Sequence, residues 1–249
     1  MKLTKFILPI LLTFLGLVLS GSNAFAQFTT EKSIDSTATP DVEEQKMKLL
    51  VTDFKSKKGL EADVMIKGLN PRKTIVLKNL TDTTLILKNY RLYTVSVVKS
   101  GYMYFAHKFW PDESTFHMER IELKTLQEGL RTNIDDITFQ GDETQIYHKS
   151  VPALEEVIDF LNVNENIKIC IIGHANGPIS DKQKSESFYR KATEKRAEAV
   201  RDYLIQHGIK EERLTTKGFG NTQMIYPDPQ TDWQIDANRR IEIQVTSLN

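Results

Sequence analysis

The chain has 249 residues, in which 33 lysines and arginines balance 33 aspartates and glutamates, and it contains one cysteine. A net charge of zero gives no electrostatic reason to expect nucleic acid as a partner. A single cysteine excludes an internal disulfide, so one or two domains of this length must be stabilised by apolar cores.

The N-terminus has the pattern of a secretory signal peptide, which we place at residues 1–26. Lys2 and Lys5 form a short basic head, an apolar run follows, and Ala24 and Ala26 supply the small residues that a signal peptidase reads. A membrane anchor is the alternative, but the apolar run is shorter than the roughly 20 residues of a spanning helix. We therefore expect an exported protein that is cleaved after Ala26 and carries a net charge of −2.

A polar segment and then a β-rich segment follow. Residues 27–46 are rich in Ser, Thr, Asp and Glu without periodicity, so we expect a flexible tether. Residues 47–125 contain short apolar strands separated by turn signals at intervals of about 8–12 residues, which is typical of a small antiparallel β-sandwich. The expected strands lie at 49–51, 62–66, 74–77, 84–87 and 92–98.

Part of this segment resembles the carboxypeptidase regulatory-like β-sandwich. The resemblance rests on a V-x-D strand at 51–53, a Y-x-V-x-V strand at 93–97 and the K-S-G-Y stretch at 99–102. It implies a non-catalytic module. A cluster of aromatic residues at the end of this segment is either a binding surface or part of the core and a strand edge: Tyr102, Tyr104, Phe105, Phe109 and Trp110.

Helices and strands alternate after Gly129. Ser150 is the expected N-cap of the first helix, and Gly208 is the expected left-handed residue after the second. The expected elements are strands at 134–139, 167–172, 213–217 and 241–245 and helices at 151–161 and 185–207. This alternation predicts a mixed sheet with helices packed on it, so the predicted fold class is α+β: a β-sandwich followed by a βαβαβ-β two-layer sandwich.

Four motifs in this second half resemble those of OmpA-like domains. They are G-H-A-N at 173–176, T-x-x-R-A-x-A-V-x-x-Y-L at 193–204, K-G-F-G at 217–220 and N-R-R-I-E-I at 238–243. Their order over residues 134–246 is that of the family. The resemblance implies an OmpA-like, peptidoglycan-binding-type domain at 126–249.

The resemblance also implies a ligand site. In OmpA-like domains a loop aspartate and a helix arginine together hold the diaminopimelate side chain of a peptidoglycan stem peptide. By position the arginine is Arg196, and Asn176 occupies the place of the aspartate. Arg196 has the alternative of pairing with Glu194, Asp202 or a loop carbonyl. The other ligand residues that the resemblance implies are Gly173, His174, Asn238, Arg239 and Arg240.

Asn176 is a departure with a physical consequence. An asparagine brings no charge, and charge-assisted hydrogen bonds contribute roughly 1.5–3 kcal/mol against about 1 kcal/mol for neutral ones. For the same ligand, we therefore expect peptidoglycan binding to be weaker by about ten-fold or more than in a relative with aspartate. Ala175 and Gln234-Ile235 also depart from the family pattern, and Asp181 or Glu186 is a candidate replacement carboxylate.

The sequence offers no motif for catalysis or metal binding: it lacks zinc-like Cys/His spacing, a G-x-S-x-G elbow and a P-loop. We expect a non-catalytic envelope protein without cofactors or metals, located in the periplasm and associated with the cell wall and outer membrane. It would bind peptidoglycan and tether another envelope protein or the outer membrane to the wall. The alternatives are an interaction or assembly protein that has lost wall binding, which Asn176 favours, and an enzyme.

Overall fold

The computed structural model describes residues 44–69, 72–88, 92–109, 111, 117–140, 144–177 and 186–248. These residues belong to one compact unit, Asp41–Asn249. The expected signal peptide lies outside the described residues, as do most of the expected tether, Trp110 and Asp181.

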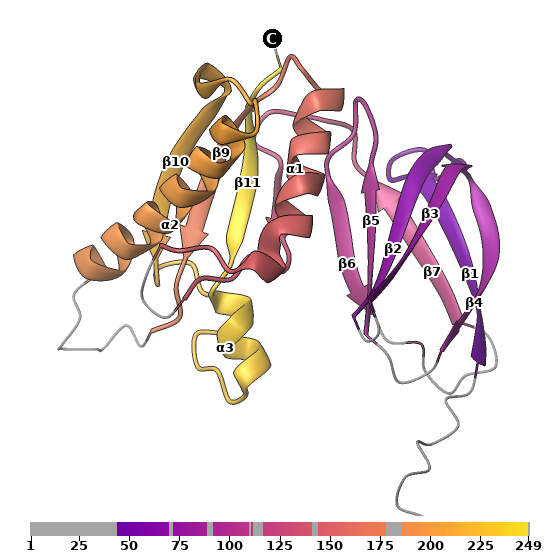
Figure 1. Ribbon diagram of the computed structural model, residues 1–249, viewed down its shortest axis with the longest axis horizontal. Helices are drawn as coiled ribbons and strands as arrows, with labels where there is room; N and C mark the ends of the chain where they lie inside the picture. Colours follow the sequence, from indigo (N-terminus) through magenta and orange to yellow (C-terminus); the bar gives the residue numbers. More distant parts are fainter. Residues whose placement is uncertain are drawn as a thin grey trace, which may run out of the picture. The chain divides into compact units, whose positions relative to one another are not determined.

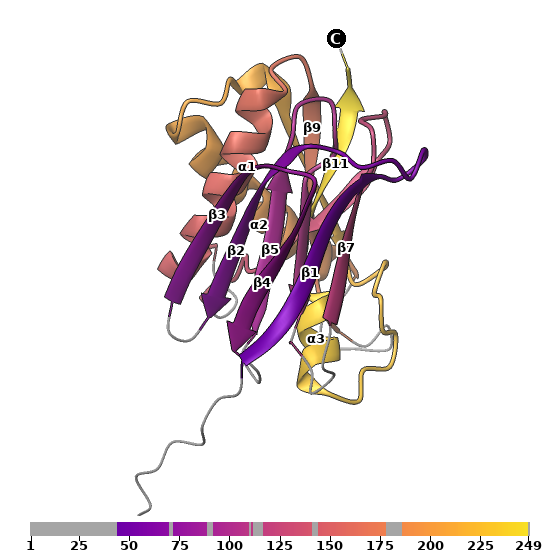
Figure 2. The ribbon, with the colours of Figure 1, turned by 90° about the vertical axis from the view of Figure 1, so that its right-hand side faces the viewer.

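The first half of the described chain is a β-sandwich, as the sequence predicts (Figures 1 and 2). One sheet has the order β4-β1-β7 and the other the order β3-β2-β5-β6. The strands are β1 (Glu44–Asp53), β2 (Ala62–Leu69), β3 (Arg72–Leu80), β4 (Asp82–Lys88), β5 (Tyr93–Val98), β6 (Phe105–Phe109) and β7 (His117–Leu123). The sandwich is not wholly antiparallel, because β1 pairs with β7 in parallel.

Side chains that alternate along the strands form the core of the sandwich. Met47, Leu49 and Val51 on β1 are fully buried, and they share one core with Ile66 of β2 and Val95 of β5 in the facing sheet. Burial of each such aliphatic side chain contributes about 1.5–3 kcal/mol. Because this alternation extends back to the start of β1, the strand begins three residues inside the segment that we expected to be tether.

The second half is a mixed sheet of order β10-β9-β11-β8, over which α1 and α2 lie (Figure 1). Strands β9 and β10 are parallel, whereas β11 is antiparallel to β9 and β8. The elements are β8 (Arg131–Ile134), α1 (Val151–Val163), β9 (Lys168–His174), α2 (Glu186–Gln206), β10 (Leu214–Gly220), α3 (Asp232–Asn238) and β11 (Ile241–Ser247). The predicted mixed sheet is confirmed, and β9 is central in it.

The apolar stripes of α1 and α2 face this sheet, as their periodicity predicts. Leu154 and Phe160 of α1 and Val200 and Leu204 of α2 are fully buried, together with Ile171 of β9. None of the described helices is both long enough and apolar enough to cross a bilayer.

The sequence predicts the C-terminal end of α2 correctly, but not the role of the Ser150 hydroxyl at the start of α1. Gly208 has φ of +93°, and the Ile209 N–H donates to Leu204 O at 3.1 Å, so the predicted left-handed end of α2 is confirmed. Ser150 stands at the start of α1, but its hydroxyl does not cap the helix; it accepts a hydrogen bond from the Thr138 N–H at 2.9 Å.

A buried polar contact joins the β-sandwich to α1. Glu156 forms an ion pair with Lys67 of β2, and it accepts a hydrogen bond from the Tyr104 hydroxyl at 2.7 Å. Tyr104 and Phe109, two of the aromatic residues noted in the sequence, are 3% and 5% exposed. These two residues are therefore part of the core and not of an exposed binding surface.

Candidate functional site: a hollow at the end of strand β9

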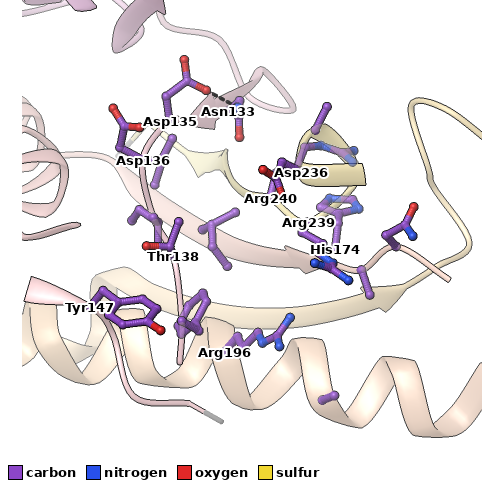
Figure 3. A pocket seen from close by; sticks show the side chains of 18 of the residues that line it. Asn133, Asp135, Asp136, Thr138, Tyr147, His174, Arg196, Asp236, Arg239 and Arg240 are labelled. Carbon is purple, nitrogen blue, oxygen red and sulfur yellow. Dashed lines mark hydrogen bonds between the residues drawn. The ribbon is translucent and has the colours of Figure 1, made fainter. Parts of the chain in front are cut away.

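A hollow lies beside the C-terminal end of β9, between α2 and the segment that joins α3 to β11. It is lined by five of the seven residues that the sequence singled out: His174, Asn176, Arg196, Arg239 and Arg240. Figure 3 shows Arg196 reaching from α2 toward the side of the hollow where His174, Arg239 and Arg240 lie. Gly173 and Asn238 are not among the lining residues, and both are buried beneath it.

Gly173 serves the packing of β9 on α2. A Cβ atom at this position would overlap the backbone carbonyl oxygen of Thr193, in the middle of α2. The lack of a side chain therefore lets the strand and the helix approach closely. This close approach fixes the distance between the loop after β9 and Arg196, one turn along α2 from Thr193.

Asn238 is fully buried and organises the wall of the hollow through three hydrogen bonds. Its Oδ1 accepts from the Tyr226 N–H at 2.9 Å, and its Nδ2 donates to the Tyr226 carbonyl oxygen at 2.7 Å. Because a backbone N–H can only donate and a backbone C=O can only accept, this pair fixes which end of the Asn238 amide is which. The same Nδ2 donates to Asn176 Oδ1 at 2.8 Å, so the orientation of the Asn176 amide is fixed as well.

Glu242 holds the basic residues at the back of the hollow. Its Oε1 accepts from Arg240 Nε at 2.8 Å, and its Oε2 lies 3.4 Å from His174 Nε2. Burial alone would raise the pKa of Glu242, but the adjacent His174 and Arg240 outweigh burial and lower this pKa from 4.5 to about 2. Glu242 is thus a paired anion at neutral pH.

His174 and Arg240 are themselves nearly inaccessible to solvent. The His174 side chain is 1% exposed and stacks on the Phe219 ring, with the two ring centroids 5.5 Å apart. The Arg240 side chain is 9% exposed, and it also donates to the Gln223 carbonyl oxygen at 3.2 Å.

Arg196 is half-buried, and its guanidinium lies over the Phe139 ring at 5.4 Å. Such cation–π contacts contribute about 0.5–2 kcal/mol and hold a flexible side chain in one direction. Asp202, one of the two acids proposed as its partner, forms an ion pair with Arg201 at 2.8 Å.

Three residues around the hollow were not foreseen from the sequence. Trp233 of α3 is 60% exposed, and its ring meets the Tyr226 ring edge-on at 5.1 Å. Asp236, also on α3, lines the hollow near Arg239 and Arg240 (Figure 3). The aromatic residues in an otherwise polar, turn-rich loop were the available signal, but a helix of seven residues shows too little periodicity to be recognised.

Acidic residues also line the opposite end of the hollow. Burial raises the pKa of Asp135, against the influence of Lys108, and Asp136 forms an ion pair with Lys108. Glu186, one suggested replacement for the missing aspartate, is exposed in the first turn of α2 and is not among the lining residues. In the described part of the chain, no group of three or more His, Cys, Asp or Glu is placed to hold a metal ion.

Comparison with known proteins finds a family match in the second half of the chain. Residues 138–239 match the OmpA family. The photosystem I P700 chlorophyll a apoprotein A2 of Gloeobacter violaceus is 29% identical over 116 residues, which are 45% of this chain and 13% of that protein. The sodium-type flagellar protein MotY of Vibrio parahaemolyticus is 28% identical over 123 residues, which are 47% of this chain and 40% of that protein.

Solved structures give a weaker likeness. The periplasmic domain of Helicobacter pylori MotB is 18% identical, with a TM-score of 0.41, and the match covers 49% of this chain and 76% of that one. The chain spans less than half the length of the curated relatives above. The match at residues 138–239 contains β9, α2 and four of the five predicted site residues that line the hollow, all but Arg240, and this part of the chain is an OmpA-family domain.

Proposed function

We propose that this protein is a non-catalytic envelope protein that binds peptidoglycan non-covalently through its OmpA-family domain. One observation carries the proposal: Asn176 and Arg196, the two residues that stand where the family holds its ligand, line the same hollow. They lie 20 residues apart in the chain, one in the loop after β9 and the other on α2, which packs closely on β9 at Gly173.

The chemistry of the hollow suits the acidic peptide of peptidoglycan. Arg196 and Arg239 line it from opposite sides, and a guanidinium binds a carboxylate through two parallel hydrogen bonds. Arg196 lies on a long helix, and its guanidinium packs against the Phe139 ring. The Arg196 side chain therefore loses little conformational entropy when it binds a ligand. The diaminopimelate carboxylate of the stem peptide is the group that we assign to Arg196.

The β-sandwich is the part of the protein that this binding would hold near the wall. The β-sandwich contacts α1 through the Lys67–Glu156 ion pair. A domain fixed to the wall then holds the sandwich, and whatever envelope protein or outer-membrane component binds it, close to the wall. We accordingly place the protein in the periplasm, with no nucleic-acid partner.

The test is co-sedimentation of the purified protein with insoluble peptidoglycan. Arg196→Ala removes charge-assisted hydrogen bonds of roughly 1.5–3 kcal/mol, so we expect the affinity to fall by ten-fold or more. Arg201→Ala is the matched control, since Arg201 lies on the same helix, pairs with Asp202 and does not line the hollow. Equal sedimentation of the two variants would contradict the proposal.

Asn176 favours a second candidate, an interaction or assembly protein that keeps this fold without binding the wall. In that case the natural protein stays in the supernatant, and Arg196→Ala changes nothing. An assay for release of soluble wall fragments separates either candidate from an enzyme.

A further inference from the structure

The hydrogen bonds around Asn176 and Asn238 determine which end of the Asn176 amide is available to a ligand in the hollow. Asn176 Oδ1 is turned toward Asn238 Nδ2 and accepts from it, and both ends of the Asn238 amide are fixed by the Tyr226 backbone. The Asn176 side chain therefore has its Nδ2 left for a ligand. This nitrogen makes no hydrogen bond within the part of the chain that the structure describes.

At position 176, an amide nitrogen selects a ligand group that accepts hydrogen bonds, whereas a carboxylate oxygen selects one that donates them. A carboxylate would accept from Asn238 with one oxygen and from a ligand ammonium with the other. The Asn176 NH₂ group only donates, and an ammonium only donates, so the two cannot bond. An ammonium that faces Asn176 Nδ2 would lose its hydration without gaining an acceptor there, at a cost that a neutral carbonyl acceptor avoids.

The neighbouring residues reinforce this preference for acceptors. Arg239 and Arg240 line the same end of the hollow; the positive charge of Arg239 repels an ammonium, whereas that of Arg240 is paired with Glu242. Arg240 Nη1 is buried and has no hydrogen-bond partner among the described residues, whereas its Nε is bonded to Glu242. Asp236 is the one carboxylate that Figure 3 labels at this end, and it sits beside the two arginines.

We propose that the hollow binds a stem peptide whose side-chain amine is acylated, as in cross-linked peptidoglycan, in preference to a stem with a free amine. The inference rests on the proposed function and names the form of its ligand. Acylation removes the positive charge and supplies a carbonyl oxygen, which accepts from Asn176 Nδ2. The free carboxylate of the same side chain remains available to Arg196.

Calorimetric titration of the purified protein with two soluble ligands tests this preference. One ligand is a diaminopimelate-containing stem tripeptide, and the other is the same peptide with its side-chain amine acetylated. We expect the acetylated peptide to bind about ten-fold tighter. Asn176→Asp keeps the acceptor for Asn238 and exchanges the donor for a carboxylate, so this substitution should reverse the preference.

Two results would overturn the inference. The first is a natural protein that binds the free-amine peptide as well as or better than the acetylated one; Asp236→Asn then shows whether Asp236 holds the ammonium. The second is a failure of the acetylated peptide to bind. If insoluble peptidoglycan still sediments the protein, only the inference falls; if it does not, the proposed function falls as well.

Discussion

The buried amide of Asn238 offers a sharp test of the hydrogen-bond arrangement, through two substitutions of the same chemical kind. Asn238→Asp and Asn176→Asp each replace an amide nitrogen by oxygen with almost no change in shape. Asn238 is fully buried, and its Nδ2 donates to two acceptors, Asn176 Oδ1 and the Tyr226 carbonyl oxygen. Asn176 uses only its Oδ1, so its nitrogen is not needed for folding.

The expected costs differ widely. Asn238→Asp removes two hydrogen bonds of about 1 kcal/mol each and sets a buried carboxylate against two acceptor oxygens, so we expect a loss of about 3–5 kcal/mol in the free energy of unfolding. Asn176→Asp keeps the bond from Asn238 and should change stability by less than about 1 kcal/mol.

Urea unfolding of both variants, followed by circular dichroism, measures these costs as shifts in the midpoint at constant slope. Similar costs for the two variants, or a larger cost for Asn176→Asp, would refute the assigned orientation of the two amides. The inference about acylated ligands would then lose its basis.

Two further predictions concern the packing and the charge of the site. Gly173→Ala forces a Cβ into the Thr193 carbonyl and should lower the free energy of unfolding by several kcal/mol. Gly208→Ala has open space around it and only a positive φ to strain, so it should lower this free energy by about 1 kcal/mol. Thermal unfolding measures both, and equal losses would contradict the packing role of Gly173. Because the pKa of Glu242 is lowered from 4.5 to about 2, its stabilisation is complete above pH 4.5 and is lost as the pH falls toward 2, by up to about 3 kcal/mol. Glu242→Gln should flatten this part of the curve of stability against pH, and an unchanged slope would count against the assignment.

Elements with strong local patterns were predictable from the sequence. The apolar period of α2, closed by Gly208 and Ile209, gave its bounds to within one residue at each end. The continuous apolar run of β9 identified a central strand, because both of its faces are buried.

Features set by distant pairing were not predictable. Strand β8 occupies 131–134 and not 134–139, because its partner β11 fixes the register at Ile134 and Asp136 turns the chain with φ of +67°. The parallel pairing of β1 with β7 joins segments about 70 residues apart, and no local sequence pattern predicts it.

The candidate site shows the same division. The motifs located the hollow, because its residues lie in or directly beside β9, α2 and β11. They did not distinguish residues that line it from those that support it: Gly173 packs a helix, and Asn238 orients a neighbour. Trp233 and Asp236 belong to a short helix whose position depends on tertiary contacts.

The most direct test of wall binding by this hollow is an NMR titration of the natural protein with soluble peptidoglycan fragments, monitored at side-chain nitrogens. We predict that Asn176 Nδ2 and Arg196 Nε shift with increasing ligand, while Arg201 Nε, on the same helix but outside the hollow, does not. Saturable shifts confined to the β-sandwich, with Asn176 and Arg196 unaffected, would contradict the account.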